Sequence, residues 1–172
     1  IVQVLDDLKL REKTLIVFSG DNGNDKSITS KIKGDIEIRG GKGTMTEAGT
    51  HVPLIANWNG TTPTGVVLKD LVDFSDLLPT FAELGGASLP GGVTIDGRSF
   101  APQLRGKKGN PRKWVYCQLG KNTLIRDERW EIAERGKIYD IKNDPYGLNL
   151  IKSGKESDEA VKRLKKILET LK

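Results

Sequence analysis

The chain has 172 residues, enough for one domain with a sizeable core, or for one domain with a small appendage. Its 36% hydrophobic and 30% charged residues exclude a disordered chain, and no run of about 20 apolar residues predicts a membrane span. The single cysteine, Cys117, excludes an internal disulfide, and a single histidine excludes a Cys/His zinc cluster. A bound metal would therefore need oxygen ligands.

The net charge of +5 would suit a polyanionic partner such as nucleic acid or a sulfated polysaccharide. Much of the excess lies in the last segment, whose amphipathic pattern predicts a helix, so a solvated helix face explains the charge better than a docking surface. We therefore expect no nucleic-acid partner. The basic residues of this segment are Lys162, Arg163, Lys165, Lys166 and Lys172.

The first part of the chain predicts an α/β arrangement. Residues 1–8 have a helical apolar pattern, and residues 14–19 form an apolar, β-branched run typical of a strand covered on both faces of a parallel sheet. Residues 24–50 are polar and Gly-rich, too long for an ordinary connection, and predict a functional loop. A second buried strand is predicted at residues 53–58.

The later part predicts helices and a small sheet. Ser75 is the predicted N-cap of a helix that ends at Gly85-Gly86. The predicted apolar face of this helix consists of Leu77, Leu78, Phe81 and Leu84. Ser157 is the predicted N-cap of the last helix, whose inward residues would be Val161, Leu164, Leu168 and Leu171. Four short alternating segments predict an antiparallel meander, at residues 114–119, 122–126, 129–133 and 137–141.

Asp21 and Asn22 follow the first predicted strand, at the edge of an open α/β sheet where ligand sites collect. A carboxylate and an amide oxygen are ligands for calcium or magnesium, but two residues fill only part of a shell of about six or more positions. Taken alone, the motif Gly20-Asp21-Asn22-Gly23 favours a plain tight turn over a metal site. By themselves these residues leave both interpretations open.

Lys42 stands among glycines in the segment Arg39-Gly40-Gly41-Lys42-Gly43-Thr44. Backbone amides and the ammonium group could converge there on a tetrahedral anion such as phosphate or sulfate. The segment is not a Walker-type phosphate loop, because Gly43 replaces the Ser or Thr that would follow the lysine. For a lone Gly-Lys-Gly segment, a flexible loop without a ligand is the favoured interpretation, and an anion site is the alternative.

His51 is the only side chain with an ordinary pKa near neutrality, so it is a candidate proton shuttle. A surface role, or a contact that supports the site from behind, is the favoured interpretation. Cys117 lies in the apolar and aromatic run Trp114-Val115-Tyr116-Cys117, which favours a buried, inert thiol over a nucleophile.

Several segments occur in a distinctive order along most of the chain. They are Phe18-Ser19-Gly20-Asp21-Asn22-Gly23, Gly40-Gly41-Lys42-Gly43-Thr44, residues 47–58, Asp73-Phe74-Ser75-Asp76-Leu77-Leu78-Pro79-Thr80, Ile95-Asp96-Gly97-Arg98-Ser99-Phe100 and Tyr139-Asp140-Ile141-Lys142-Asn143-Asp144-Pro145. In this order and spacing they resemble the C-terminal half of the sulfatase family.

The resemblance implies a fold and roles for three residues. The implied fold is α/β: residues 1–108 would be part of an alkaline-phosphatase/sulfatase-like sandwich with a mostly parallel sheet, and residues 109–172 a small subdomain of antiparallel strands and a helix. Asp21 and Asn22 would hold a divalent cation, usually calcium, and Lys42 would contact the sulfate group. Two departures from the family pattern are His51, where an arginine is usual, and Thr46, where an aromatic residue is frequent.

The resemblance also shows what this chain lacks. Sulfatases use a formylglycine made in a Cys/Ser-x-Pro-x-Arg motif, which this sequence does not contain, since Cys117 is followed by Gln118-Leu119-Gly120. The formylglycine and further metal-binding aspartates are expected in a preceding N-terminal half. We therefore expect a sulfate-ester hydrolase part that is inactive alone, and that pairs with that half or with itself through an exposed sheet edge.

Two other functions remain open from the sequence. One is a phosphoester or phosphonate hydrolase of the same superfamily, and the other is a non-catalytic module that binds polyanions. The resemblance further implies an exported, periplasmic or lysosomal protein, although the chain carries no targeting signal of its own that we can identify.

Overall fold

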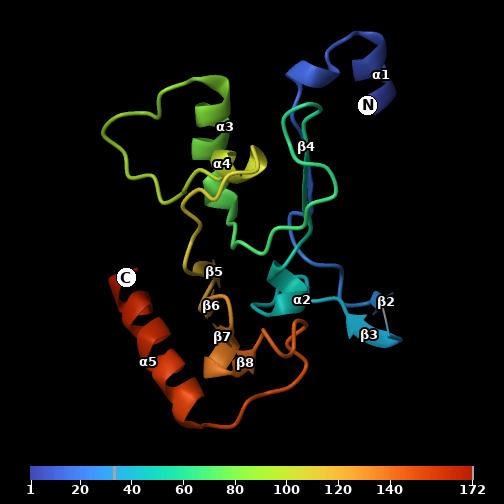
Figure 1. Cartoon of the computed structure of the whole chain (residues 1–172). Coiled ribbons are helices and arrows are strands. Elements are labelled where there is room, and N and C mark those ends of the chain that lie inside the picture. Colours follow the sequence, from blue (N-terminus) through green and yellow to red (C-terminus); the bar gives the residue numbers. More distant parts are fainter. Residues whose placement is uncertain (33, 172) are drawn as a thin grey trace. The chain divides into compact units, whose positions relative to one another are not determined.

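A computed structural model describes residues 1–32 and 34–171 (Figure 1), so the predicted basic residue Lys172 lies outside the described part. The chain divides into two compact units. The first contains Ile1–Ser19 and Leu54–Arg112, and the second contains Gly20–Pro53 and the chain from Lys113 onward. Each unit is described by itself below. The predicted division after residue 108 stays a prediction.

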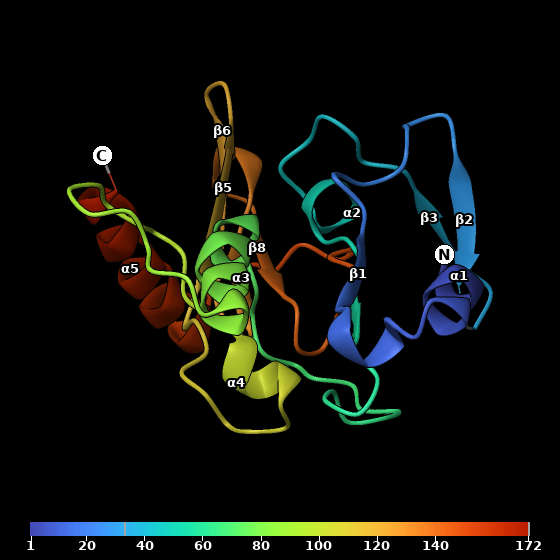
Figure 2. The same cartoon turned by 90° about the horizontal axis from the view of Figure 1, so that it is seen from above.

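The first unit contains the predicted N-terminal helix, both predicted early strands and the helix before Gly86. In both views, α3 and α4 lie together (Figure 2). The elements are α1 (Val2–Asp7), η1 (Arg11–Lys13), β1 (Ile16–Ser19), β4 (Leu54–Asn57), η2 (Phe74–Asp76), α3 (Leu77–Gly85) and α4 (Ala101–Leu104).

β1 and β4 pair antiparallel, with Val17 opposite Ala56, so the expected parallel pairing is wrong for these two strands. Parallel neighbours need a long crossover, usually a helix, and the helix between these strands, α2 (Glu47–Thr50), has only four residues. Phe18 and Ile55 are 60% and 58% exposed. The apolar pattern predicts that both faces of these strands are buried. Within the described part of the chain, Phe18 and Ile55 are left exposed, so this burial is incomplete.

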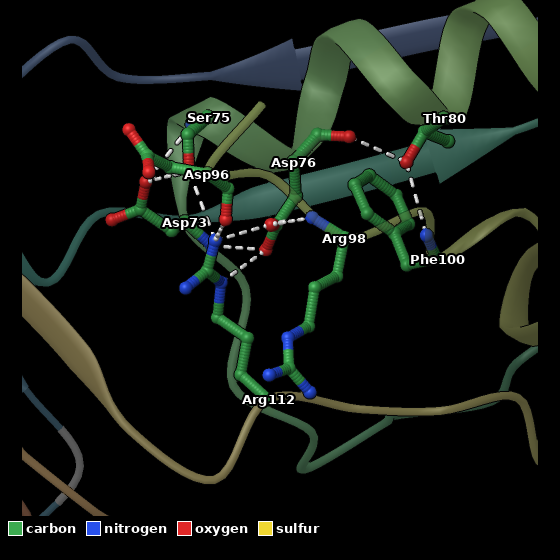
Figure 3. A network of polar contacts seen from close by, with 8 residues as sticks. All are labelled: Asp73, Ser75, Asp76, Thr80, Asp96, Arg98, Phe100 and Arg112. Carbon is green, nitrogen blue, oxygen red and sulfur yellow. Dashed lines mark hydrogen bonds and ion pairs between the residues drawn. The ribbon is translucent and has the colours of Figure 1, made fainter. Parts of the chain in front are cut away.

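The start of α3 is fixed by a buried ion pair (Figure 3). Asp76 and Arg112 are only 2% and 9% exposed, and the Asp76 carboxylate accepts from Arg112 Nε at 2.7 Å and Nη2 at 2.5 Å. The same carboxylate accepts from the backbone N–H of Asp73 at 2.9 Å and of Arg98 at 2.6 Å. It therefore joins three separate segments of the first unit.

The predicted N-cap of this helix, Ser75, is wrong, because the N-cap of α3 is Asp76 and a different residue caps the preceding turn, η2. Asp73 caps η2, because its side chain accepts from the backbone N–H of Ser75 at 2.9 Å. The Ser75 hydroxyl instead donates to Asp73 at 2.6 Å and accepts from Arg112 at 2.9 Å (Figure 3). The predicted end is confirmed, since Gly86 is the C-cap with a left-handed φ of 67°.

The second unit contains the predicted meander, which is confirmed as an antiparallel sheet in the order β5-β6-β7-β8. The predicted loop at 24–50 contains an antiparallel hairpin and a short helix that were not predicted. The remaining elements of this unit are β2 (Thr29–Ile32), β3 (Ile36–Arg39), β5 (Val115–Leu119), β6 (Asn122–Arg126), β7 (Trp130–Ile132), η3 (Glu134–Gly136), β8 (Ile138–Asp140) and α5 (Lys155–Thr170).

The core of the second unit lies between α5 and the sheet, which Figure 1 shows side by side. Leu164 and Ala160 of the helix pack with Ile125, Trp130 and Ile132 of the strands. This arrangement buries the apolar face of α5 and leaves its lysines in solvent.

The ends of α5 differ from the prediction. The N-cap is Gly154, and Ser157 lies one turn further on, where its Oγ accepts from the Gly154 N–H at 2.9 Å. Leu171 is exposed rather than inward, because it follows the last helical residue, Thr170. Over the described ranges, no helix combines the length and apolar character that crossing a membrane requires.

Candidate functional site

Asp21 and Asn22 form a turn directly after β1. The Asp21 Oδ1 accepts from the Asn22 backbone N–H at 2.9 Å, and the Asn22 amide nitrogen donates to the carbonyl of Gly23 at 2.9 Å. The second bond fixes the orientation of the Asn22 side-chain amide. Its nitrogen is engaged with Gly23, and its Oδ1 is the other terminal atom of the amide. Asp21 is exposed and Asn22 is half-buried, so both can offer oxygen to a ligand.

The Asp21-Asn22 turn rests against the backbone of α2. The Gly23 N–H donates to the carbonyl of Gly49 at 2.9 Å. A Cβ at position 23 would lie only 1.8 Å from the carbonyl oxygen of Ala48, so Gly23 is required for this close approach. The geometry of the turn is therefore tied to the position of α2.

The Lys42 turn rests against the same helix. A Cβ at Gly41 would lie 2.6 Å from both the carbonyl carbon of Ala48 and the nitrogen of Gly49, so this turn also approaches α2 closely. The backbone N–H of Lys42 donates to the carbonyl of Asn24 at 2.9 Å, directly linking the two turns. The Lys42 side chain is exposed. The turn is thus a packed structure rather than an unsupported loop.

His51 is the C-terminal cap of α2. Its Nδ1 lies 2.6 Å from Glu47 Oε2, and its side chain is 63% exposed. Burial opposes ionisation of Glu47, but hydrogen bonds with His51 and Glu131 and the charge of Arg126 lower the Glu47 pKa. The structure thus places His51 beside a buried carboxylate at the end of α2, and its predicted supporting role stays a prediction.

The family model named Sulfatase matches residues 1–87, which is half of the chain. The chain belongs to the sulfatase family. Human arylsulfatase A is 39% identical over 116 residues, which cover 67% of this chain and 22% of that protein. Mouse steryl-sulfatase is 36% identical over 138 residues, which cover 76% of this chain and 22% of that protein.

Solved structures confirm the sulfatase fold. A Bacteroides thetaiotaomicron protein, solved in work on the metabolism of multiple glycosaminoglycans, superposes with a TM-score of 0.74 at 23% identity. The match covers 99% of this chain and 41% of that protein. The α/β class, the small antiparallel sheet and the C-terminal helix are therefore confirmed. The chain spans less than half the length of these sulfatase relatives.

The side chains of the candidate site include oxygen donors of the kind that a hard cation prefers, but too few of them to form a complete coordination shell. Asp21 and Asn22 offer carboxylate and amide oxygens, as calcium prefers. Across residues 1–32 and 34–171, no three His, Cys, Asp or Glu side chains converge to complete a metal shell. Cys117 lies half-buried in β5. The two turns therefore carry two side chains with oxygen donors, Asp21 and Asn22, and one lysine, Lys42.

Three residues behind the two turns were not identified from the sequence: Arg126, Glu131 and Glu134. Glu47 was identified only as part of the family pattern, without a role. Arg126 forms an ion pair with Glu47, and Glu134 Oε1 accepts from the backbone N–H of Met45 at 2.7 Å. Glu131 is 1% exposed in β7. Its position between Trp130 and Ile132 was the available signal, because a charged residue in the middle of a short apolar strand is uncommon.

Proposed function

We propose that this chain is the C-terminal part of a sulfatase that hydrolyses sulfate esters to an alcohol and inorganic sulfate. Asp21 and Asn22 hold a divalent cation, most simply calcium, and Lys42 contacts the sulfate group. The observation that carries this proposal is the packing of both turns on α2 within one compact unit of a sulfatase-family chain. Because they share this support, the oxygen donors and the lysine can act on one substrate group.

The chemistry that these residues supply is charge stabilisation. A lysine ammonium has three N–H donors and no acceptor, so the exposed Lys42 side chain can donate to sulfuryl oxygens as negative charge builds on them. A bound cation would polarise the same oxygens as a Lewis acid. Asp21 and Asn22 would contribute by holding that cation with their side-chain oxygens. None of these three residues is the nucleophile.

The nucleophile and the other cation ligands belong to a preceding part of the protein. The segment nearest to the formylglycine motif is Ser88-Leu89-Pro90-Gly91-Gly92, which has glycine where the motif requires arginine. The exposed Phe18 and Ile55 of β1 and β4 are apolar surface that such a part would cover. The proposed partner of this chain is therefore the N-terminal half of the same enzyme.

The purified chain is expected to show no hydrolysis of an aryl sulfate, because it has no formylglycine. The measurement is release of nitrophenol from p-nitrophenyl sulfate with calcium present. A parallel preparation of the Lys42→Ala variant identifies contaminating enzyme, since any contaminant gives equal rates in both samples. Turnover by the chain that Lys42→Ala abolishes would contradict the proposed division of the active site.

A further inference from the structure

A buried carboxylate cluster lies behind the Lys42 turn and consists of Glu47, Arg126 and Glu131. Glu47 lies at the start of α2, Arg126 is in β6, and Glu131 is its cross-strand partner in β7. All three side chains are largely removed from solvent. Arg126 Nη1 pairs with Glu47 Oε1, and the Glu131 carboxyl is hydrogen-bonded to Glu47. Within the described residues, Glu131 Oε2 is buried without a hydrogen-bond partner.

The charges of the cluster require a proton. One guanidinium balances one carboxylate, so two ionised carboxylates would leave an uncompensated negative charge in a buried site. A proton between the two carboxyls removes that charge and supplies the hydrogen that joins them. Burial first, then the hydrogen bond and charge of Glu47, raise the pKa of Glu131 to about 9, while Arg126 lowers it. Glu131 is therefore the member that carries the proton at neutral pH.

The cluster is connected to the candidate site through α2. Glu47 is the first residue of this helix, and the backbone of Ala48 and Gly49 supports both the Asp21-Asn22 turn and the Lys42 turn. A displacement of Glu47 would therefore move the oxygen donors and the lysine together. The Met45 N–H, bonded to Glu134, gives the segment a second attachment to the C-terminal half of the same unit.

We propose that Glu47, Arg126 and Glu131 are positioning residues, which hold α2 and the two turns in place while Glu131 keeps its proton. The roles of Lys42 and Asp21 rest on the proposed sulfatase function, whereas the attachment of α2 does not. Loss of the proton places a second negative charge against Glu47, and the repulsion loosens the start of α2. The turns then lose their common support.

Other titratable groups also face this cluster and must be separated from it. His51 contacts Glu47 from the end of α2, and Glu134 approaches from η3. Tyr139 of β8 is opposite Glu131, and burial followed by the charge of Glu131 raises the Tyr139 pKa. Asp144 also acts on Tyr139 from the turn after β8. Tyr139 is therefore the neighbouring group whose ionisation has to be tested by substitution.

The sign of the pH effect on stability follows from the Glu131 proton. The unfolded chain releases it near the ordinary glutamate pKa of 4.5, whereas the folded chain keeps it up to about 9. The unfolded state therefore binds fewer protons between these values, so the free energy of unfolding falls as pH rises through this window. Glu131→Gln removes this slope because glutamine does not titrate.

The test is a pH titration of the 172-residue chain labelled with 13C-methyl methionine. Met45 is the only methionine, so a single buried resonance reports on the segment between Lys42 and Glu47. In the wild-type chain we expect this resonance to titrate with a midpoint near pH 9. Glu131→Gln should abolish the titration, and Glu47→Gln should lower the midpoint. Tyr139→Phe should leave it in place.

A second readout examines the Lys42 turn itself. The rate of trypsin cleavage after Lys42 at pH 8 is expected to rise roughly tenfold in the Glu47→Gln variant. The reason is that loss of one buried hydrogen bond between charged groups makes local opening of this turn more frequent. Cleavage after the exposed Lys165 should stay unchanged, whereas global destabilisation would accelerate both. Glu37→Gln is the matched control, because Glu37 forms an exposed pair with Lys31 at 3.6 Å in the same unit.

Two results would overturn the proposal: a Met45 titration that persists in Glu131→Gln, or unchanged cleavage after Lys42 in a folded Glu47→Gln chain. If Glu47→Gln does not fold, Glu131→Gln decides alone, because it replaces a neutral acid by a neutral amide of the same shape. Neither readout uses a substrate. Failure of the sulfatase function would therefore appear only in hydrolysis assays, separately from failure of the positioning role.

Discussion

Replacement of Arg112 by methionine is expected to lower the free energy of unfolding by roughly 3–5 kcal/mol, the usual cost of removing one partner from a buried ion pair. The Asp76 carboxylate would lose two hydrogen bonds with Arg112 while remaining buried. Methionine retains much of the arginine volume, so the effect reports mainly on charge and hydrogen bonding. Urea denaturation followed by circular dichroism measures the change.

The matched control for Arg112 is Arg105→Met. Arg105 pairs with Glu83 at 3.4 Å in the same unit, but both side chains are well exposed. Such pairs contribute about 0–1 kcal/mol. A loss below about 1 kcal/mol in Arg112→Met would show that Asp76 does not depend on this partner, and would contradict the role assigned to the network in Figure 3.

Leu164→Ala is expected to destabilise the chain by roughly 2–5 kcal/mol, as for other buried leucines. Leu164 is fully buried between α5 and the sheet, against Ile125, Trp130 and Ile132. Its truncation leaves a cavity at the centre of the second unit. Thermal or urea unfolding should show the loss, and protection of α5 amides from hydrogen exchange should fall with it.

Lys165→Ala is the control for Leu164, because Lys165 is the next residue of the same helix and faces solvent. It should change the free energy of unfolding by less than about 0.5 kcal/mol. Equal effects of the two substitutions would contradict the packing of α5 on β6 and β7.

The four-stranded meander was predictable because its segments alternate and are separated by Gly or charged turns, which is a local signal. The β2–β3 hairpin was missed because its strands are short and polar and lie in a Gly-rich stretch. The antiparallel pairing of β1 with β4 was also not predictable, since an apolar strand has the same composition whichever direction its neighbour runs. Partner direction depends on the path of the intervening chain.

The residues proposed for the candidate site were named from the sequence, whereas the backbone that supports them was not predicted. Asp21, Asn22 and Lys42 were identified from motifs and from the family resemblance. Their common attachment to α2 depends on close backbone approaches at Gly23 and Gly41. A glycine in the sequence permits such an approach but does not indicate which segment comes close to it. Glu131 was missed because its significance comes from a contact with Glu47, which is far away in the sequence.

The most direct measurement of the proposed function is kcat/KM for aryl sulfate hydrolysis. The enzyme for this assay is the longer protein that is expressed when the coding sequence upstream of Ile1 is included. Lys42→Ala should lower kcat/KM by roughly 100- to 1000-fold, as for other groups that stabilise developing negative charge. Lys31→Ala, in the exposed pair with Glu37, should leave it unchanged. A Lys42→Ala enzyme with wild-type kcat/KM would contradict the assignment of this turn to the sulfate-ester site.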